Sequence, residues 1–168
     1  MKLAARLCAT IFFLQACAPV GSRHTSDAAL ARLFESRQAE FESLRAEFAA
    51  NSELMALFAG DRADLHQNNI YAMKRARLPQ ENVEKYEGRL RRLRLWCITK
   101  GGRGLEFPVD PGTVSNGDSY KGFYWYREGQ PPDIRPSLDE YRLSKNDKDL
   151  MVYKALKGHW YLYIFANR

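Results

Sequence analysis

Histidine is the side chain of this sequence best suited to metal binding or to proton transfer near neutral pH. Three histidines occur, and they lie far apart in the chain: His24, His66 and His159. No two have the spacing of metal ligands, such as His-x₃-His, and no two cysteines are close enough in sequence to form a ligand pair. We therefore predict no metal site and no cofactor.

Motifs of nucleophilic catalysis are also missing from the sequence. No Gly-x-Ser-x-Gly and no Ser-x-x-Lys stands in a suitable context, and Asp139-Glu140 is expected to act as a cap or to face solvent around a turn. Gly101-Gly102-Arg103-Gly104 lies between two predicted strands and does not open a helix, so it predicts a hairpin turn and not a phosphate cradle. We expect no catalytic residue and no enzymatic activity.

Positive charge is concentrated in one stretch of the chain. Residues 74–103 hold ten Lys or Arg and three Glu, within a chain whose net charge is +6. One interpretation is a solvated helix face whose arginines compensate the helix dipole. The other is a surface that contacts an anionic component of the cell envelope or an acidic protein. The candidate contact residues are Arg89, Arg91, Arg92 and Arg94.

Residues 1–16 predict a secretory signal peptide. Lys2 and Arg6 supply a positive start, and residues 7–16 form an apolar run with two polar interruptions. This run is too short to span a bilayer as a permanent helix.

The segment Leu14-Gln15-Ala16-Cys17 resembles the lipobox of bacterial lipoproteins. The resemblance implies cleavage before Cys17, attachment of lipid, palmitate included, to this cysteine, and a membrane anchor for the mature chain. Stable anchoring takes at least two acyl chains, since one binds only marginally. Ala18 implies sorting to the outer membrane, with the domain facing the periplasm. The alternative is secretion as a soluble protein, with cleavage near Ala16 or Ala18.

This predicted address bears on two other features. Export argues against nucleic acid as the partner of the basic stretch. Once Cys8 is removed and Cys17 is acylated, Cys97 has no partner for an intramolecular disulfide. Its neighbours in Leu95-Trp96-Cys97-Ile98 are apolar, so we expect a buried and unreactive thiol.

The mature chain is expected to be a tether followed by one domain. Residues 17–26 contain Pro, Gly and Ser and predict a lipidated tether, and residues 27–168 have the length of a single domain. Ser26 and Asp27 can cap a helix that runs from about 27 to 50. Five apolar residues share one face of that helix: Leu30, Phe34, Phe41, Leu44 and Phe48. Residues 54–58 predict a short apolar helix or turn, and a second main helix begins at Pro79.

From residue 93 the hydrophobic period changes to two, which is typical of strands. Five strands are expected, at 93–99, 105–109, 119–127, 151–155 and 160–165, with loops at 110–118 and 128–137 and a helical turn at 138–143. The alternation places Phe123 and Trp125 on one face and Tyr124 and Tyr126 on the other. The tyrosine face either packs inside the protein or forms an exposed row that binds sugars or a protein.

Two stretches, Tyr120-Lys121-Gly122-Phe123-Tyr124-Trp125 and Gly158-His159-Trp160-Tyr161-Leu162-Tyr163, resemble those of a set of small uncharacterised bacterial proteins. Together with the segments around Pro131-Pro132, Ser137 to Tyr141 and Tyr153-Lys154, the resemblance covers about half of the mature chain. It implies that the sheet is a recurring module, and it implies no activity and no functional residue.

These observations together predict the α+β class, with two main N-terminal helices packed on a C-terminal antiparallel sheet of about five strands. The expected function is that of a membrane-anchored envelope lipoprotein that acts as a binding or interaction module. The alternatives are a hydrolase-type enzyme acting on envelope polymers and an inhibitor of an exported enzyme, for which the loop 128–137 is the candidate contact. The sequence indicates no oligomeric state.

Overall fold

The computed structural model of the chain describes residues 24–52, 54–58, 80–114, 117–141 and 150–167. Both predicted helices are present, α1 over Asp27–Ala50 and α2 over Gln80–Arg92, together with an antiparallel sheet, so the α+β class is confirmed. One strand of that sheet lies between the two helices in the chain, and the other five follow them. The predicted signal peptide, Cys17 and the whole of 59–79 and 142–149 lie outside the described residues.

Helix α1 begins where the sequence predicts. The Ser26 hydroxyl accepts a hydrogen bond from the Ala29 N–H at 3.3 Å, which satisfies one of the free donors of the first turn. The helix bends at Arg37, whose φ of −132° and ψ of 18° are not helical. Arg37 is exposed at the point where the apolar stripe is interrupted. All five predicted stripe residues are buried: Leu30, Phe34, Phe41, Leu44 and Phe48.

Helix α2 ends in a left-handed turn. The Leu95 N–H donates to the Leu90 carbonyl at 2.8 Å and the Arg94 N–H donates to the Arg91 carbonyl at 3.1 Å, which is the hydrogen-bond pair of a Schellman motif. Arg94 has a φ of 57°, in the region that favours glycine. Because this cap occupies the residues after the helix, the next strand begins at Cys97, later than the sequence predicts.

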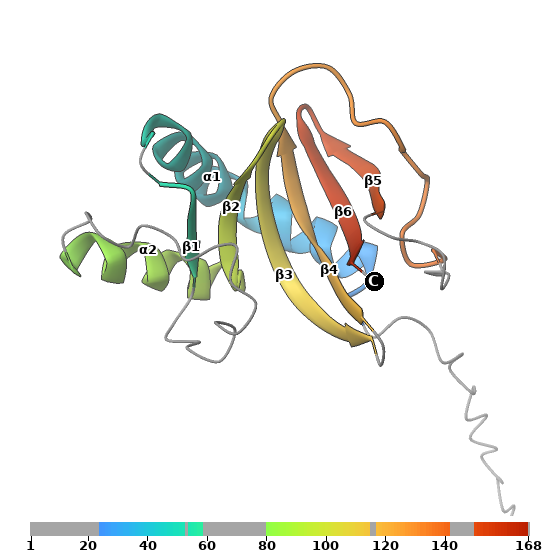
Figure 1. Ribbon diagram of the computed structural model, residues 1–168, viewed down its shortest axis with the longest axis horizontal. Coiled ribbons are helices and arrows are strands. Elements are labelled where there is room, and N and C mark those ends of the chain that lie inside the picture. The colour runs from blue at the N-terminus through green and yellow to red at the C-terminus, as the bar shows by residue number, and fades with distance from the viewer. Residues whose placement is uncertain (1–23, 53, 59–79, 115–116, 142–149, 168) are drawn as a thin grey trace, which may run out of the picture.

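The sheet is antiparallel and has the strand order β1-β2-β3-β4-β6-β5 (Figure 1). Its strands are β1 Ala56–Phe58, β2 Cys97–Gly101, β3 Gly104–Val114, β4 Gly117–Tyr126, β5 Leu150–Lys157 and β6 Trp160–Asn167. The five predicted strands correspond to β2 through β6. The predicted loop at 110–118 is wrong, because β3 and β4 continue to pair beyond a bulge between Pro108 and Asp110.

Two local predictions are also corrected. Residues 56–58 form no helix or turn but an edge strand, in which Leu57 pairs with Ile98. A run of so few apolar residues has no resolvable period, and the open edge of β2 supplies backbone partners. Residues 138–141 form a turn closed by the Tyr141 N–H and the Leu138 carbonyl at 3.2 Å, with no helix over the described part of 138–143.

The segment after β4 crosses to the far edge of the sheet, and β6 then returns between β4 and β5 (Figure 1). On its way the segment runs along β5. The Tyr153 N–H donates to the Asp133 carbonyl at 2.8 Å, and the Arg135 N–H donates to the Tyr153 carbonyl at 2.7 Å. The middle of the predicted loop 128–137 is therefore tied to the sheet edge.

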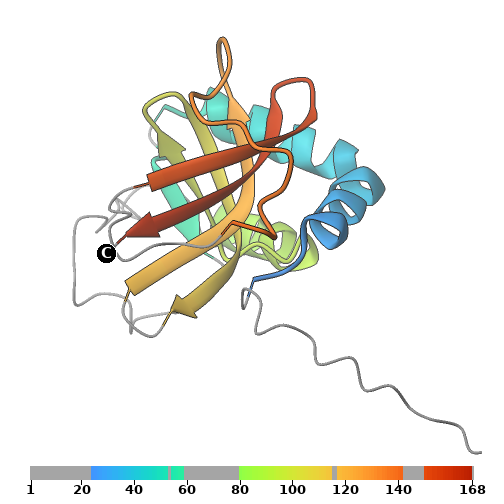
Figure 2. The same ribbon diagram turned by 90° about the vertical axis from the view of Figure 1, so that its right-hand side faces the viewer.

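The two faces of the sheet bury different side chains. Helix α1 covers one face, and α2 lies beside β1 and β2 (Figures 1 and 2). Phe123, Trp160 and the α1 stripe meet in the core between helix and sheet. Five tyrosines cluster on the opposite face, each at most 5% exposed: Tyr124, Tyr126, Tyr153, Tyr161 and Tyr163. The predicted alternation is confirmed, and the interpretation of an exposed tyrosine row is wrong.

A buried ionic cluster fixes the start of α1 to the sheet. Lys121 on β4 is 1% exposed, and its Nζ lies 2.7 Å from Asp27 Oδ1 and 2.6 Å from Asp139 Oδ1. Lys154 reaches Asp27 Oδ2 at 3.0 Å, and the Leu138 N–H donates to the same oxygen at 2.8 Å. Burial alone raises the pKa of the Asp27 carboxyl, but these hydrogen bonds and the Lys121 charge outweigh it and hold the pKa below its usual value.

Candidate functional site

The four arginines that we predicted to contact an anionic partner differ in burial: one is buried and three are exposed. The Arg89 guanidinium is buried, with Nη1 at 2.7 Å from Glu47 Oε2 and Nη2 at 2.9 Å from the Ser43 hydroxyl, so it joins α2 to α1. Burial raises the pKa of Glu47, but the bonds from Arg89 and Ser43 outweigh that effect and lower it. The other three are exposed: Arg91, Arg92 and Arg94.

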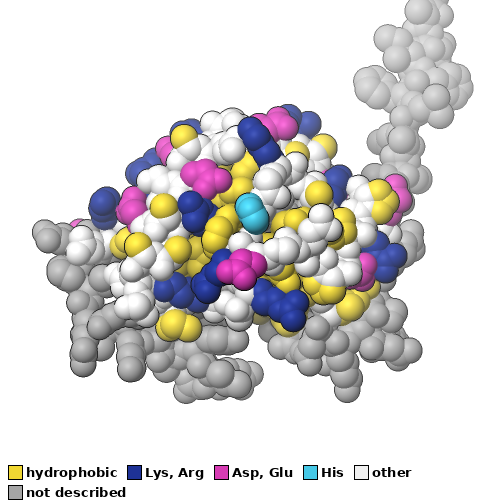
Figure 3. Space-filling model, turned by 90° about the horizontal axis from the view of Figure 1, so that it is seen from above, with side chains coloured by type: hydrophobic (Ala, Val, Ile, Leu, Met, Phe, Trp, Pro, Cys, Tyr) yellow, Lys and Arg dark blue, Asp and Glu magenta, His cyan; other side chains and the backbone are white. Residues whose placement is uncertain are grey.

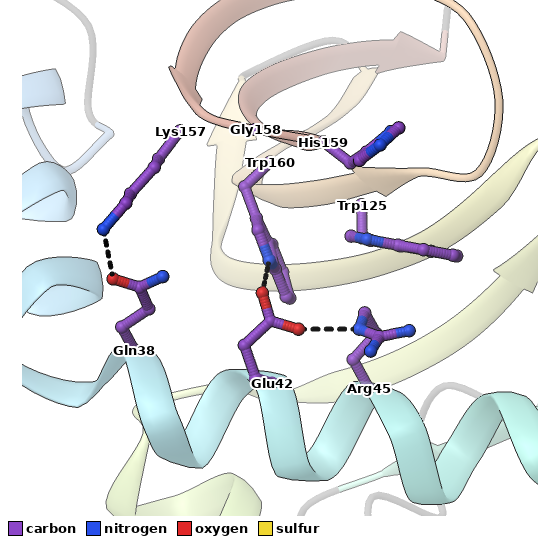
Figure 4. Close-up of a pocket in the computed structure, with 8 residues that line it drawn as sticks. All are labelled: Gln38, Glu42, Arg45, Trp125, Lys157, Gly158, His159 and Trp160. Atoms are coloured by element: carbon purple, nitrogen blue, oxygen red, sulfur yellow. Dashed lines mark hydrogen bonds and ion pairs between the residues drawn. The ribbon is translucent and has the colours of Figure 1, made fainter.

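A pocket of about 370 Å³ opens between α1 and the β5–β6 turn (Figure 4). We call it the Trp125 pocket. It is lined by Gln38, Glu42, Arg45, Trp125, Lys157, Gly158, His159 and Trp160. Seen from the end that carries this turn, recessed hydrophobic side chains lie among Lys, Arg, Asp and Glu (Figure 3). The volume lies at the small end of the range for sites that bind small molecules.

The floor of the pocket is a fixed acid–indole–arginine arrangement. The Trp160 Nε1–H donates to Glu42 Oε1 at 2.6 Å, and Arg45 Nε donates to Glu42 Oε2 at 2.8 Å (Figure 4). Trp160 is buried, and its ring contacts Phe34 and Phe107 in the core, so its position is set by packing. Glu42 thus orients Arg45, and a carboxylate engaged at both oxygens is poorly placed to act as a general base.

Trp125 forms the wall of the pocket. The Arg45 guanidinium lies over its ring at 4.7 Å from the centroid, a cation–π contact. The His159 ring lies on the other side of Trp125, with centroids 6.4 Å apart and a tilt of 50° between the planes (Figure 4). Trp125 is only partly buried, in contrast to its strand neighbour Phe123. Trp125 therefore lies between two nitrogen-rich side chains, with part of its ring still exposed.

The rim of the pocket is polar. Lys157 Nζ donates to Gln38 Oε1 at 3.1 Å, which links the β5–β6 turn to α1. Lys157, Gly158 and His159 are all exposed, so the pocket is open to solvent on this side. Arg45 and Lys157 give the lining two positive charges against the single carboxylate of Glu42, and this excess favours an anionic ligand.

The tyrosine face contains a second group of chemically interesting side chains. Glu106 on β3 pairs with Tyr124 on β4, and its carboxylate and the Tyr124 hydroxyl both approach Gly101. Burial raises the pKa of the Glu106 carboxyl, and burial together with nearby Glu106 raises the pKa of Tyr124 to about 12. The Arg103 guanidinium donates to the Tyr126 hydroxyl at 3.0 Å at the end of this face. Tyr124 is therefore a neutral hydrogen-bonding group at physiological pH.

Other predicted features lie where the sequence places them. His159 is in the β5–β6 turn, and His24 Nε2 lies 2.8 Å from the Ser119 hydroxyl on β4, whereas His66 is outside the described residues. Cys97 is a free thiol, 2% exposed, and burial raises its pKa well above the ordinary value, as the prediction of a buried thiol requires. Within the described ranges, no cluster of His, Cys, Asp or Glu could hold a metal ion, and no helix is long and apolar enough to cross a membrane.

Sequence reasoning missed the Trp125 pocket. The alternation places Trp125 on the same face as Phe123, without distinguishing the partly exposed ring from the buried one, and no motif singles out Glu42. A signal was nevertheless present, since Gln38, Glu42 and Arg45 are spaced by four and three residues and so form a polar stripe beside the apolar one.

Comparison with known proteins adds nothing to this geometry: no family model, no curated protein and no solved structure matches the chain.

Proposed function

We propose that the chain is a membrane-anchored envelope lipoprotein that acts as a binding module through the Trp125 pocket. The observation that carries the proposal is the Trp125 ring, partly exposed and lying against a guanidinium that Glu42 holds in place. Such an aromatic surface with a few fixed polar groups is typical of ligand sites. The activity of such a module is recognition, with no chemical step.

The proposed lipid on Cys17 would keep the pocket near a membrane. His24 is bonded to Ser119 on β4, so six residues, and seven residue-to-residue steps, separate the proposed anchor from the folded domain. A chain of that length spans at most about 25 Å. A ligand in the same membrane layer would therefore be met at high effective concentration, and modest affinity would suffice. The proposed location is the outer membrane facing the periplasm, with secretion as the alternative, and exposed Arg91, Arg92 and Arg94 are the proposed contacts with an anionic envelope component.

The binding proposal is tested by photocrosslinking in intact cells. A photoreactive amino acid replaces exposed His159 in the full-length chain, and the adducts are compared with and without Trp125→Leu. We expect adducts that the substitution abolishes while the fold, followed by circular dichroism, is retained. A photoreactive residue at Arg32, exposed on α1 away from the pocket, is the matched control. Adducts at 159 that do not depend on Trp125 would refute the proposal.

The anchor is tested separately. Metabolic labelling with palmitate should mark the wild-type chain and leave Cys17→Ala unlabelled. A wild-type chain that is unlabelled and fully soluble would refute the lipoprotein part of the proposal and leave the pocket untouched.

A second candidate function is a hydrolase-type enzyme acting on envelope polymers. It is favoured by the Glu106 carboxyl, whose raised pKa suits a general acid, beside the Tyr124 hydroxyl. The test is release of soluble fragments from purified envelope polymers by the wild type and by Glu106→Gln. Fragment release that this variant loses would establish the enzyme, and equal release by both would exclude Glu106 from any catalytic role.

A further inference from the structure

We infer that the ligand of the Trp125 pocket is an anionic saccharide, with its sugar ring against Trp125 and its oxyanion on Arg45. The inference rests on the binding function proposed above and names the class of ligand. Three features of the pocket carry it: the free edge of the Arg45 guanidinium, the tilt of the aromatic walls, and the polar rim.

One edge of the Arg45 guanidinium, that of Nε, donates to Glu42, and the edge formed by the two Nη groups is available to a ligand. Nε donates to Glu42, and the ring of Trp125 fixes the plane of the group. Within the part of the chain that the structure describes, the two Nη groups have no protein partner. Two parallel N–H donors at such an edge match the two oxygens of a carboxylate or of a phosphate. Because Glu42 and Trp125 already hold the side chain, little conformational entropy is lost when the anion binds.

The aromatic walls fit a puckered ring better than a flat one. Trp125 and His159 are inclined by 50°, with centroids 6.4 Å apart, so a planar aromatic ligand cannot stack on both. A pyranose ring is puckered, and its C–H groups can pack against the part of the Trp125 ring that Arg45 and the tilted His159 imidazole leave exposed. The polarised C–H groups of a sugar also complement the negative face of the indole.

The rim supplies the hydrogen bonds that sugar hydroxyls require. The Gln38 side-chain oxygen accepts from Lys157, which leaves its amide N–H₂ group to donate, and Lys157 has further donors on its ammonium. Each carboxylate oxygen of Glu42 has a second lone pair that can accept from a hydroxyl. Donors and acceptors thus alternate around one aromatic wall, whereas an apolar ligand would leave them without partners.

The test is isothermal titration calorimetry of the full-length chain with tri-galacturonate and with its methyl ester, in which a methyl group replaces the negative charge of each carboxylate. We expect the acid to bind at least tenfold more tightly than the ester. Arg45→Gln should abolish that difference, so that acid and ester bind with equal affinity, since a hydrogen bond to a charged group commonly contributes tenfold or more. Trp125→Leu should weaken both ligands. Arg32→Gln, on the same helix but outside the pocket, should change neither by more than about twofold.

Equal affinity for acid and ester, or an acid affinity that Arg45→Gln does not change, would overturn the inference. Absence of Arg45-dependent binding by tri-galacturonate and by glucose 6-phosphate alike would also overturn it, while the Trp125-dependent crosslinks decide the binding function independently. Glucose 6-phosphate is the second arm: binding that depends on Arg45 supports the inference with phosphate as the oxyanion, and Arg45-dependent binding of galacturonate alone assigns a carboxylate.

Discussion

Replacing Lys121 with methionine should destabilise the protein because it leaves the Asp27 carboxylate buried without one of its two positively charged partners. Lys121 is 1% exposed and lies within 2.7 Å of both Asp27 and Asp139. Breaking a buried ion pair from one side costs about 3–5 kcal/mol. Asp27 keeps Lys154 and the Leu138 N–H, so we expect a loss of about 3 kcal/mol of unfolding free energy. For a domain of this size that corresponds to a decrease in Tm of about 10 °C.

The double variant Asp27→Asn with Lys121→Met separates charge from packing. An asparagine oxygen can still accept from the Leu138 N–H, and the carboxylate that also loses Lys121, that of Asp139, is 37% exposed and keeps the Asp27 N–H as a donor. The double variant should therefore regain at least about 1 kcal/mol relative to Lys121→Met. Lys85→Met is the control, because Lys85 is 65% exposed and only 4.0 Å from Glu47, and it should change the stability by less than about 0.5 kcal/mol.

The effect of Lys121→Met should depend on pH in a defined direction. The pKa of Asp27 is lowered in the folded protein, so its contribution is present above the unfolded pKa and is lost as the pH falls through the folded value. The wild type therefore loses this stabilisation below about pH 4. The difference in unfolding free energy between the wild type and Lys121→Met should become smaller there. Urea unfolding followed by circular dichroism at neutral pH and near pH 3 measures both. A deficit under 1 kcal/mol at neutral pH, or one that grows on acidification, would refute the reasoning.

Three further predictions concern single residues. Arg94→Gly should raise the unfolding free energy by about 0.5–1 kcal/mol in urea titrations, because glycine adopts the positive φ at that cap without strain, whereas Arg94→Ala should give no gain. Glu106→Gln should raise the unfolding free energy at neutral pH but not below about pH 4. Burial raises the pKa of Glu106, so ionising this carboxyl costs more free energy in the folded than in the unfolded state. A gain in stability that does not depend on pH would contradict this prediction. The Cys97 thiol should react with a disulfide reagent at least about 100-fold faster in urea than in the folded protein, because burial disfavours the thiolate; equal rates would show that Cys97 is accessible.

Helix α1 could be predicted within a residue of each end, while the edge of the sheet could not. The helix has a cap at Ser26 and a stripe of five apolar residues, so local chemistry and periodicity agree. Strand β1 has three residues and no period of its own, and it forms because β2 offers an unpaired edge. The position of β6 between β4 and β5 is equally hard to predict. The turn residues indicate that β5 and β6 form a hairpin, but they do not determine which of the two strands pairs with β4.

The candidate site was less predictable than the fold because its residues come from three separate segments. Gln38, Glu42 and Arg45 are ordinary polar residues of a helix until the fold places them opposite Trp125 and the β5–β6 turn. The basic stretch shows the converse: Arg89 belongs to the charge excess in sequence, yet in the structure it is an internal bridge from α2 to Glu47. Charge counts along a chain do not distinguish an arginine that faces solvent from one that joins two helices.

The ionic cluster and the Trp125 pocket are two ends of one contact between α1 and β4. Alternate residues of β4 face the helix: Lys121 meets Asp27, Phe123 meets Phe34 and Phe41, and Trp125 meets Arg45. The seating of the helix on the sheet therefore determines whether Arg45 lies over Trp125. On the other side of the strand Gly122 allows β4 to lie close to β3, since a Cβ there would collide with the Phe107 carbonyl. A pocket formed by a helix that is fixed at its opposite end should be largely preformed, and its affinity for a ligand should fall when the Lys121 cluster is broken, although no residue of that cluster touches the pocket.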